Sequence, residues 1–390
     1  MNYGKYVFSQ IMEQLPRHDF DVCVKKYQGE RYAKSFSCRD QFFAMAFGQL
    51  AYRESLRDVV ACLRSHRSKL YHLGFQSSVA LVTLAGANEK RDWKIYRDFA
   101  DILIGQARKL YADEPAIAED IAGSCYAIDS ASIELCLSLF PCFPFVSTKA
   151  AVKLHLVLDI RGSIPTFFDM TSGKVNDMNF LDNVLLERAA FYVMDRGYVD
   201  FKRLHAIHTA DAYFVTHAKV NMRFERRYSN PVDKTTGMLC DQVIVLTGAG
   251  ALEKYPDTIR RIKYRDTETG QVYVFLTNNF TISAYSVALL YKHRWQIELF
   301  FKWIKQHLKI EAFWGRSPNA VKTQICIALC TYLTVAILKK RLCLKQSIYE
   351  ILQIVSVSLF DKEALAELFS DDSLQNNIEG AGSTASLFEF

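Results

Sequence analysis

Residues 291–305, YKHRWQIELFFKWIK, constrain the fold of this chain more than any other stretch. They contain no Gly or Pro, and good helix formers fill most positions, so the sequence predicts one helix here. At about 100° per residue, Trp295 and six other apolar side chains cover most of the circumference. A helix that is apolar over most of its girth is normally buried. The chain is therefore expected to enclose this helix in a core.

The same helix carries a narrow polar stripe with one carboxylate among cations. Its members are Tyr291, Arg294, Glu298, Lys302 and Lys305. Spacings of four residues allow ion pairs on a solvated face, which is one interpretation. The other is a site for metal and phosphate, because a buried carboxylate beside cations suits both. The aromatic girth leaves little room for a solvated face and favours the second interpretation.

Length and charge indicate a globular protein with a polyanionic partner. The 390 residues, half of them apolar, suffice for two or three domains. The net charge is +6, yet residues 361–390 carry −6, so the remainder carries +12. Basic residues gather at 219–227, 260–265 and 292–309. Nucleic acid is the partner that this pattern suggests, and ordinary surface charge is the alternative.

The cysteines and apolar runs indicate a cytoplasmic compartment. Ten Cys occur without a CxxC pair, and the first twenty residues lack the apolar core of a secretory signal. The run from Ile325 to Leu338 is too short and too interrupted to span a bilayer. We therefore expect a reducing cytoplasm and no membrane partner.

The first 115 residues predict a helical domain. Residues 38–65 have a helical pattern, and a second long helix is expected over residues 83–111, with the hydroxyl of Thr83 as its N-cap. Basic side chains are scattered along both. A DNA-binding domain and a dimerisation or core-support domain are both open, and the first is favoured.

From Cys125 the pattern changes to short strands. Residues 152–171 alternate as a hairpin, 177–190 read as a helix, and strands follow at 191–195 and 213–219. The predicted order is three antiparallel strands, a helix, a strand, a helix and a further strand. This is the order of an RNase H-like α/β layer. We expect this core over residues 120–340.

Two further regions complete the predicted organisation. Residues 220–280 interrupt the alternation of strands and helices with three predicted strands. They are interpreted as a β-rich insertion in the core. Pro318 marks a plausible helix start. Residues 341–390 are expected to form a helical region followed by a polar tail.

Two aspartates on strands are the candidate partners of Glu298. Asp129 lies inside an apolar strand and Asp195 ends another, which are costly places for an unpaired carboxylate. Either one alone is more commonly a structural cap. Together, Asp129, Asp195 and Glu298 fit the shared and flanking ligands of two divalent cations, which stabilise attacking and leaving oxygens in phosphoryl transfer. Asp159 is the main decoy, because the Arg-Gly that follows it predicts a turn.

These motifs resemble the bacterial insertion-sequence transposases of the DDE kind, in the insertion sequence four group. That group's signature is Tyr, two residues, Arg, three residues, Glu, six residues, Lys, and it is matched by Tyr291, Arg294, Glu298 and Lys305. The contexts AIDSA and MDRGY resemble the strands that carry its two catalytic aspartates. The segment TLAGANEKRDW resembles the domain ahead of its catalytic core, so the likeness covers about residues 1–340.

The resemblance implies a chemistry and a set of partners. Asp129, Asp195 and Glu298 would be the catalytic residues and would hold Mg²⁺, with Mn²⁺ as a substitute. The substrate would be the terminal inverted repeats of the element and its target DNA. A homodimer in the DNA complex and a place at the bacterial nucleoid are further implications.

It also implies the DNA contacts. Arg294, Lys302 and Lys305 would bind phosphates near the cut, and Tyr291 would donate a hydrogen bond to one. Trp295 could stack on an unstacked terminal base, although packing in the core is the favoured interpretation. Arg196 could touch DNA or pair with Asp195.

Two other functions share these residues. An RNase H-like nuclease would cut but not join strands. A non-catalytic DNA-binding protein derived from a transposon would bind without cutting, although it would have no need of all three carboxylates.

Overall fold

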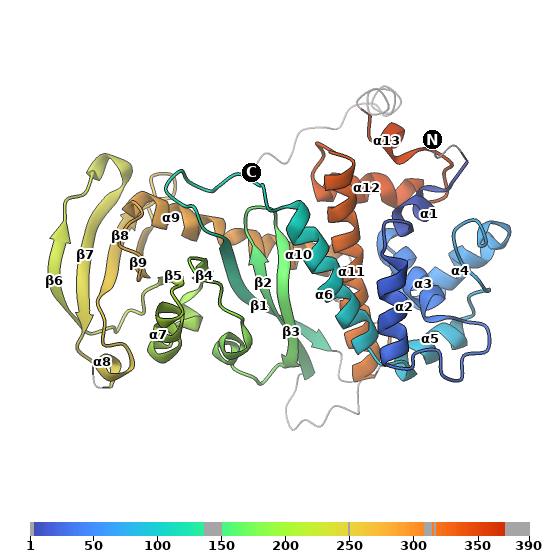
Figure 1. The fold of residues 1–390 in the computed structure, drawn as a ribbon, viewed down its shortest axis with the longest axis horizontal. Coiled ribbons are helices and arrows are strands. Elements are labelled where there is room, and N and C mark those ends of the chain that lie inside the picture. Colours follow the sequence, from blue (N-terminus) through green and yellow to red (C-terminus); the bar gives the residue numbers. More distant parts are fainter. Residues whose placement is uncertain (1–3, 136–149, 249, 308–313, 316, 371–390) are drawn as a thin grey trace. The chain divides into compact units, whose positions relative to one another are not determined.

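The computed structural model describes residues 4–135, 150–248, 250–307, 314–315 and 317–370. The chain divides into two compact units (Figure 1). The first comprises Met1–Leu110 and Lys305–Phe390, and the second comprises Tyr111–Ile304. The helical and sheet-containing units together make a mixed α/β protein with one large sheet.

The first unit is helical in its described part. Its helices are α1 (Val7–Met12), α2 (Arg17–Lys26), α3 (Cys38–Leu50), α4 (Leu56–Ser65), α5 (Leu81–Lys90), α6 (Lys94–Leu110), α11 (Pro318–Arg341), α12 (Ile348–Ser358) and α13 (Leu365–Leu368). Helix α11 begins where Pro318 predicts, because the Ser317 side chain caps it by accepting from the Ala320 N–H. It packs on α6, α3 and α5 and forms the centre of this unit's core.

Helix α11 is also longer than the sequence pattern suggests. Its 24 residues are apolar enough for a membrane span by composition, but 94% of its most apolar window is buried inside the structure. The core helix of a globular unit has this character, because it is apolar on every side.

Helices α5 and α6 replace the single helix predicted over residues 83–111, so that prediction is wrong. Arg91 has extended backbone angles, and its guanidinium donates to the carbonyl of Ser37 and to Gln41. Asp92 then accepts from the Lys94 N–H and starts α6. Helix α5 begins at Leu81, and no described side chain caps it, so Thr83 is not its cap. Contacts with a distant helix decide this break.

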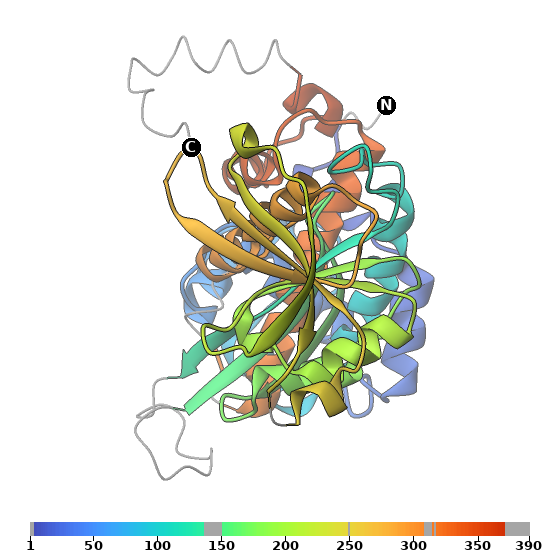
Figure 2. The same ribbon diagram turned by 90° about the vertical axis from the view of Figure 1, so that its left-hand side faces the viewer.

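The second unit is built on a nine-stranded sheet (Figures 1 and 2). Its strands are β1 (Cys125–Leu135), β2 (Ala150–Asp159), β3 (Ile164–Ser172), β4 (Phe191–Met194), β5 (Tyr213–His217), β6 (Phe224–Asn230), β7 (Met238–Leu246), β8 (Ile259–Arg265) and β9 (Val272–Thr277). The order across the sheet is β3-β2-β1-β4-β5-β9-β8-β7-β6. Figure 2 shows the strands fanning across one another, as the twist of a sheet requires.

Strand direction divides this sheet into two parts. Strands β3, β2 and β1 are antiparallel, whereas β1, β4 and β5 run parallel. Helix α7 (Phe201–Thr209) connects β4 to β5, and its Leu204 and Ile207 pack in the core with Tyr192 and Phe214. The strands after β5 continue the same sheet, because β9 pairs antiparallel with β5. Residues 220–280 therefore extend the sheet and include one strand, β6, that the sequence pattern missed.

Residues 177–190 form no α-helix, so that prediction is wrong. A 3-10 helix covers Asp177–Asn183, where the Asn176 side chain accepts from the Met178 N–H. The chain then runs without regular structure to β4. The Tyr192 hydroxyl accepts from the Glu187 N–H, and Ala189 adopts a left-handed φ of 59°. These contacts satisfy the backbone without helical bonds.

The single helix predicted over residues 291–305 is two helices, which corrects that prediction. Helix α9 (Ala284–His293) and α10 (Trp295–His307) meet at Arg294. The Arg294 N–H donates to the Tyr291 carbonyl at 3.1 Å, and the Ile297 N–H donates to the Arg294 carbonyl at 3.1 Å. These three-residue spacings tighten the turn at Arg294. The polar stripe is thus divided between two helices.

Candidate active site

Asp129 and Asp195 are neighbours on parallel strands. Strands β1 and β4 pair with Ile128 opposite Met194, and each aspartate follows its member of this pair. Asp195 lies just beyond the carboxyl end of β4, and β1 continues past Asp129 beside β2. The sheet register therefore brings the two carboxylates to one place. Ligands in open α/β sheets commonly bind at the carboxyl ends of such strands.

Arg294 joins Asp129 to Glu298. Its guanidinium lies 2.6 Å from Glu298 Oε1 and 3.7 Å from Asp129 Oδ2. The Arg294 side chain is only 13% exposed, compared with 22% for Asp129 and 33% for Glu298. Its Nε is buried without a hydrogen-bond partner in the described part of the chain. The helix junction places a largely desolvated cation between carboxylates from a strand and a helix.

Tyr291 connects the preceding helix to the other aspartate. Its hydroxyl donates to Asp195 Oδ1 over 3.4 Å, and the Arg294 guanidinium lies 5.4 Å from its ring centre. Burial raises the pKa of Tyr291 to about 12, so the hydroxyl keeps its proton and acts as a donor. Tyr291 and Arg294 together thus contact all three candidate carboxylates.

Burial and the neighbouring charges shift the pKa of Asp129. Burial raises it to about 6, hydrogen bonding from the Ser130 N–H and the charge of Arg294 oppose this, and the carboxylates of Glu298 and Asp195 add to it. A buried carboxylate raised by two further carboxylates favours a cation nearby. The donor set therefore has the chemistry of a divalent-cation site.

In this arrangement the Arg294 guanidinium lies near two of the three carboxylates that could hold a cation, Asp129 and Glu298. Among the residues that the structure describes, no three Asp, Glu, His or Cys side chains are close enough to hold one metal as they lie. Arg294 pairs with Glu298 and approaches Asp129 in this arrangement. The three carboxylates fit a divalent cation in their chemistry.

The remaining predicted contacts lie on the same helix or next to Asp195. Trp295 is 57% exposed, so the expectation that it packs in the core is wrong. Lys302 is exposed and Lys305 is half-buried. Arg196 is exposed, and its backbone N–H donates to Asp195 Oδ1. Trp295 and these three cations are available for contacts with a ligand.

Two residues near the carboxylates were missed by the sequence reasoning. His217 ends β5 one position after Thr216, which pairs with Met194, so it neighbours Asp195 across the sheet. Burial lowers its pKa, and the charge of Arg196 lowers it further. Tyr198 is 3% exposed, and its hydroxyl has no partner among the described residues. Burial and the charge of Asp129 raise the Tyr198 pKa. The position of His217 at the end of the next parallel strand was a readable signal.

An aromatic pocket adjoins this arrangement within the same unit. Its volume is about 450 Å³, and its lining includes Tyr264, Tyr273, Phe275, Tyr285, Tyr291 and Trp295. Lys292 and Arg294 supply positive charge, and Asp266 and Glu268 supply negative charge. A pocket walled by aromatic rings beside cations suits a planar base better than a small ion.

Two other aspartates of this unit, the decoy Asp159 and also Asp177, have structural partners. Asp159 closes a turn by binding Arg161 at 2.8 Å and by accepting its N–H. Asp177 accepts from Ser130 at 2.6 Å and pairs with Lys153 at 3.0 Å. These satisfied aspartates do not need a cation.

Two family matches cover most of the chain. Residues 122–334 match the family described as "Transposase DDE domain". Residues 3–76 match a domain of unknown function, DUF4372. The matched range of the first contains Asp129, Asp195 and Glu298.

Named relatives come from three bacteria. The y4zB protein of Sinorhizobium fredii, a transposase by name, is 33% identical over 221 residues, which cover 56% of this chain and 62% of that protein. A protein of Geobacillus stearothermophilus named a transposase for insertion sequence element IS5377 is 27% identical, covering 53% and 54%. A Synechocystis protein named a transposase for insertion sequence element IS4SA is 24% identical, and the match covers 70% of this chain and 76% of that protein. The chain thus spans less than two thirds of the length of the first two relatives.

One solved structure is similar over most of the chain. It is the cryo-EM structure of a piggyBac transposase synaptic complex with hairpin DNA. The TM-score is 0.45 at 11% identity, with 95% of this chain and 82% of that chain covered.

Proposed function

We propose, from the premise that this chain belongs to the transposase DDE domain family, that it excises and inserts a DNA element. The reaction is Mg²⁺-dependent hydrolysis of phosphodiesters at the element's ends followed by strand transfer. The observation that carries the proposal is the meeting of Asp129 and Asp195 on parallel strands, with Arg294 joining Asp129 to Glu298. The sheet order β3-β2-β1-β4-β5 supports an RNase H-like core.

Asp129, Asp195 and Glu298 would hold Mg²⁺, with Mn²⁺ as a substitute. When bound, the metal stabilises the attacking and leaving oxygens of the displacement. The raised pKa of Asp129 means that a cationic partner would stabilise its carboxylate. Tyr291 orients Asp195 through its hydroxyl, and its hydrogen bond is free to shift to a phosphate when DNA arrives.

Arg294 is proposed to change partners during binding. Released from Glu298 and Asp129, its guanidinium can bind a phosphate with two donors. Lys302, Lys305 and Arg196 add phosphate contacts around it. Trp295, with 57% of its surface exposed, is placed to stack on an unpaired base at the pocket of aromatic rings.

The domains take roles that follow from this chemistry. Residues 1–115 form the DNA-binding domain, 120–340 the catalytic core with the β-rich insertion 220–280, and 341–390 a C-terminal helical region and tail. Helix α11 lies inside the sequence range of the catalytic core but packs in the core of the first unit. The protein acts as a homodimer on paired terminal repeats and on target DNA. It works in the cytoplasm at the bacterial nucleoid.

The test uses purified protein and a DNA fragment carrying the element's own end. Wild type, Asp195→Asn and Asp211→Asn are run with Mg²⁺ or EDTA on a denaturing gel. Asp211 is the matched control, because it is exposed and its φ of 55° suits Asn. We expect metal-dependent nicking at the element boundary in wild type and in the control, and none in Asp195→Asn.

A strand-transfer assay with a target plasmid separates the alternatives. Joined products are expected from wild type. Cleavage without joining would instead indicate a nuclease, and binding without cleavage would indicate a non-catalytic DNA-binding protein.

A further inference from the structure

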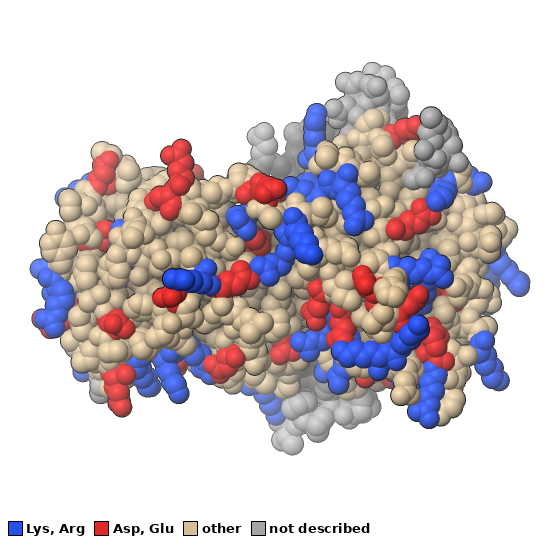
Figure 3. Space-filling view, viewed as in Figure 1, with Lys and Arg blue, Asp and Glu red and all other residues tan. Residues whose placement is uncertain are grey.

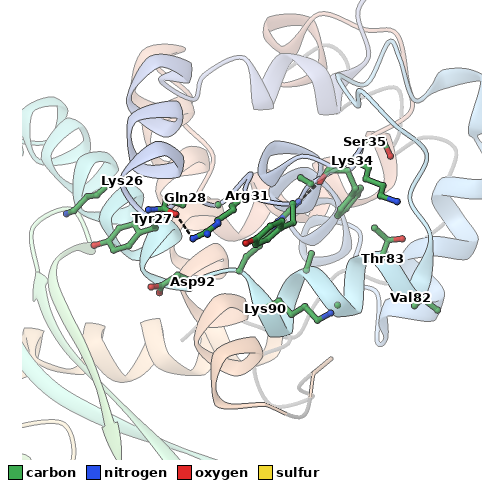
Figure 4. A pocket seen from close by; sticks show the side chains of 17 residues that line it. Lys26, Tyr27, Gln28, Arg31, Lys34, Ser35, Val82, Thr83, Lys90 and Asp92 are labelled. Atoms are coloured by element: carbon green, nitrogen blue, oxygen red, sulfur yellow. Dashed lines mark hydrogen bonds between the residues drawn. The ribbon is translucent and has the colours of Figure 1, made fainter.

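A large basic cleft lies in the first unit, within residues 26–92 (Figure 4). Its volume is about 940 Å³. The loop between α2 and α3 forms one wall with Arg31, Lys34 and Ser35, and α5 forms the other with Thr83 and Lys90. Its lining does not include Asp129, Asp195 or Glu298. The family match for most of this region carries no function.

Among the described residues, three cations in the cleft lack a carboxylate partner. The side chains of Lys34 and Lys90 make no hydrogen bond or ion pair in this part of the chain, and the Arg31 guanidinium donates only to the neutral Gln28 amide oxygen at 3.2 Å. The other cations lining the cleft differ, because Lys26 pairs with Asp98 at 2.6 Å and Arg91 approaches Glu30 at 3.9 Å. Uncompensated cations in a concavity attract a polyanion.

The carboxylate of Asp92, which also lines the cleft, is engaged elsewhere. It accepts from the Lys94 N–H at 2.9 Å and so caps α6. It keeps its negative charge, but it is the single carboxylate among five cations in the cleft lining. The net charge of the lining is therefore positive. Figure 3 shows cations and carboxylates interspersed over one face of the molecule.

An exposed aromatic ring stands beside these cations. Tyr32 is 87% exposed and has a left-handed φ of 67°. The Arg31 guanidinium lies 5.0 Å from its ring centre. Val82 on the opposite wall is 84% exposed. Apolar and aromatic surface of this kind, left in water beside cations, suits sugars and bases more than a simple inorganic anion.

We propose that this cleft binds the phosphodiester backbone of DNA. Arg31, Lys34 and Lys90 contact successive phosphates from the two walls, and Tyr32 packs against a deoxyribose between them. The inference deepens the proposed function, on which it rests, by giving its DNA-binding domain a surface. It also assigns a ligand class to a region whose family match has none.

The test measures DNA affinity of the full chain by fluorescence anisotropy. A labelled duplex carrying the element's end is titrated without metal at several salt concentrations. The double variant Lys34→Gln, Lys90→Gln should lower the salt slope by about 1.8, because each phosphate that is no longer neutralised accounts for about 0.9. At about 0.1 M salt the affinity should fall on the order of 10- to 100-fold.

Matched variants test whether a change in DNA binding comes from the cleft cations. Arg57→Gln with Arg64→Gln removes two exposed cations from α4 that do not line the cleft, and should leave the slope unchanged. Lys34→Arg with Lys90→Arg should keep the slope of wild type. Tyr32→Ala should weaken binding severalfold with the slope unchanged, because a ring that packs on a deoxyribose carries no charge.

The outcomes separate this inference from the proposed function. The proposal that the cleft binds DNA would be overturned by an unchanged salt slope in the Lys34, Lys90 variant. A reduced salt slope in the Arg57, Arg64 variant instead would also overturn it. So would a wild type that binds no DNA. If the cleft variants behave as expected but wild type does not nick DNA with Mg²⁺, the cleft stands and the proposed reaction fails.

Discussion

At the residue scale, the three carboxylates and Arg294 form the proposed active site. Arg294 is held between Glu298 and Asp129, and each of these side chains is at most one third exposed. In such surroundings, charge pairs are stronger than in water, and removing one member leaves the others poorly compensated. Changes at these positions should therefore act on catalysis and on local electrostatics separately.

Glu298→Gln is expected to abolish cleavage and to leave DNA binding nearly intact. The amide oxygen can still accept from Arg294, whereas one candidate metal ligand and one negative charge near the phosphates are removed. Cleavage on a denaturing gel and affinity by anisotropy should be measured on the same preparation. Cutting at the wild-type rate would remove Glu298 from the active site.

His155 provides a prediction for pH. It is 1% exposed, stacks on Phe180 and bonds to Thr171, and burial lowers its pKa below the ordinary 6.5. The unfolded chain therefore takes a proton that the folded chain refuses, so stability falls as pH drops from 6.5 through the folded pKa. The opposing Asp177 and the adjacent Lys153 both lie near this ring.

His155→Asn should flatten this dependence. The loss of melting temperature between about pH 8 and about pH 5.5, measured by calorimetry, is expected to be smaller in the variant than in wild type. Equal losses in both proteins would show that His155 does not titrate differently on folding.

At the element scale, the strands after β5 support the candidate active site. Arg260 on β8 is 5% exposed. Its guanidinium binds Asp241 on β7 at 2.8 and 2.9 Å and donates to the carbonyls of Asn279 and Ile282. Ile282 directly precedes the Ser283 cap of α9, the helix that carries Tyr291. The β-rich region thus holds the start of the helix that contacts Asp195.

Arg260→Leu is expected to destabilise the protein by about 3–5 kcal/mol, because it leaves Asp241 buried and unpaired. Arg227→Leu is the matched control, since it breaks a pair with Glu225 in which both partners are 56% exposed. That change should cost about 0–1 kcal/mol. Urea unfolding measures both. Equal effects would mean that burial of the Arg260 pair contributes nothing to stability.

At the scale of the whole molecule, the two units have different tasks in the proposed reaction. The sheet unit supplies the carboxylates, and the helical unit supplies the basic cleft. We propose that the DNA ends are paired before transfer and that more than one copy of the chain holds them. We therefore expect two chains and two end fragments in the active complex.

Mass photometry of the complex formed with end DNA and Ca²⁺ in place of Mg²⁺ tests this stoichiometry. A mass equal to two chains and two duplexes is expected. Mixing an excess of Glu298→Gln protein with wild type should lower strand transfer through mixed dimers. Transfer that depends only on the wild-type concentration would contradict a dimer.

The sequence by itself determined the types of most elements and the residues that carry charge. Periodicity is local, so the alternation of residues 152–160 predicted β2, and Pro318 predicted the start of α11. The membership of the transposase DDE family was also readable, because the spacing of Tyr291, Arg294, Glu298 and Lys305 is a property of the chain alone. The catalytic roles of those residues stay predictions.

Tertiary contacts decided what periodicity cannot express. The turn at Arg294 interrupts a pattern that reads as one helix, and the same residue reaches carboxylates on two elements. Trp295 is exposed despite its apolar neighbours. Helices α5 and α6 separate at Arg91 because its guanidinium binds α3 and the residues just before it. Each outcome depends on residues distant in sequence, whose combined contacts outweigh local propensities of a few tenths to about 1 kcal/mol per residue.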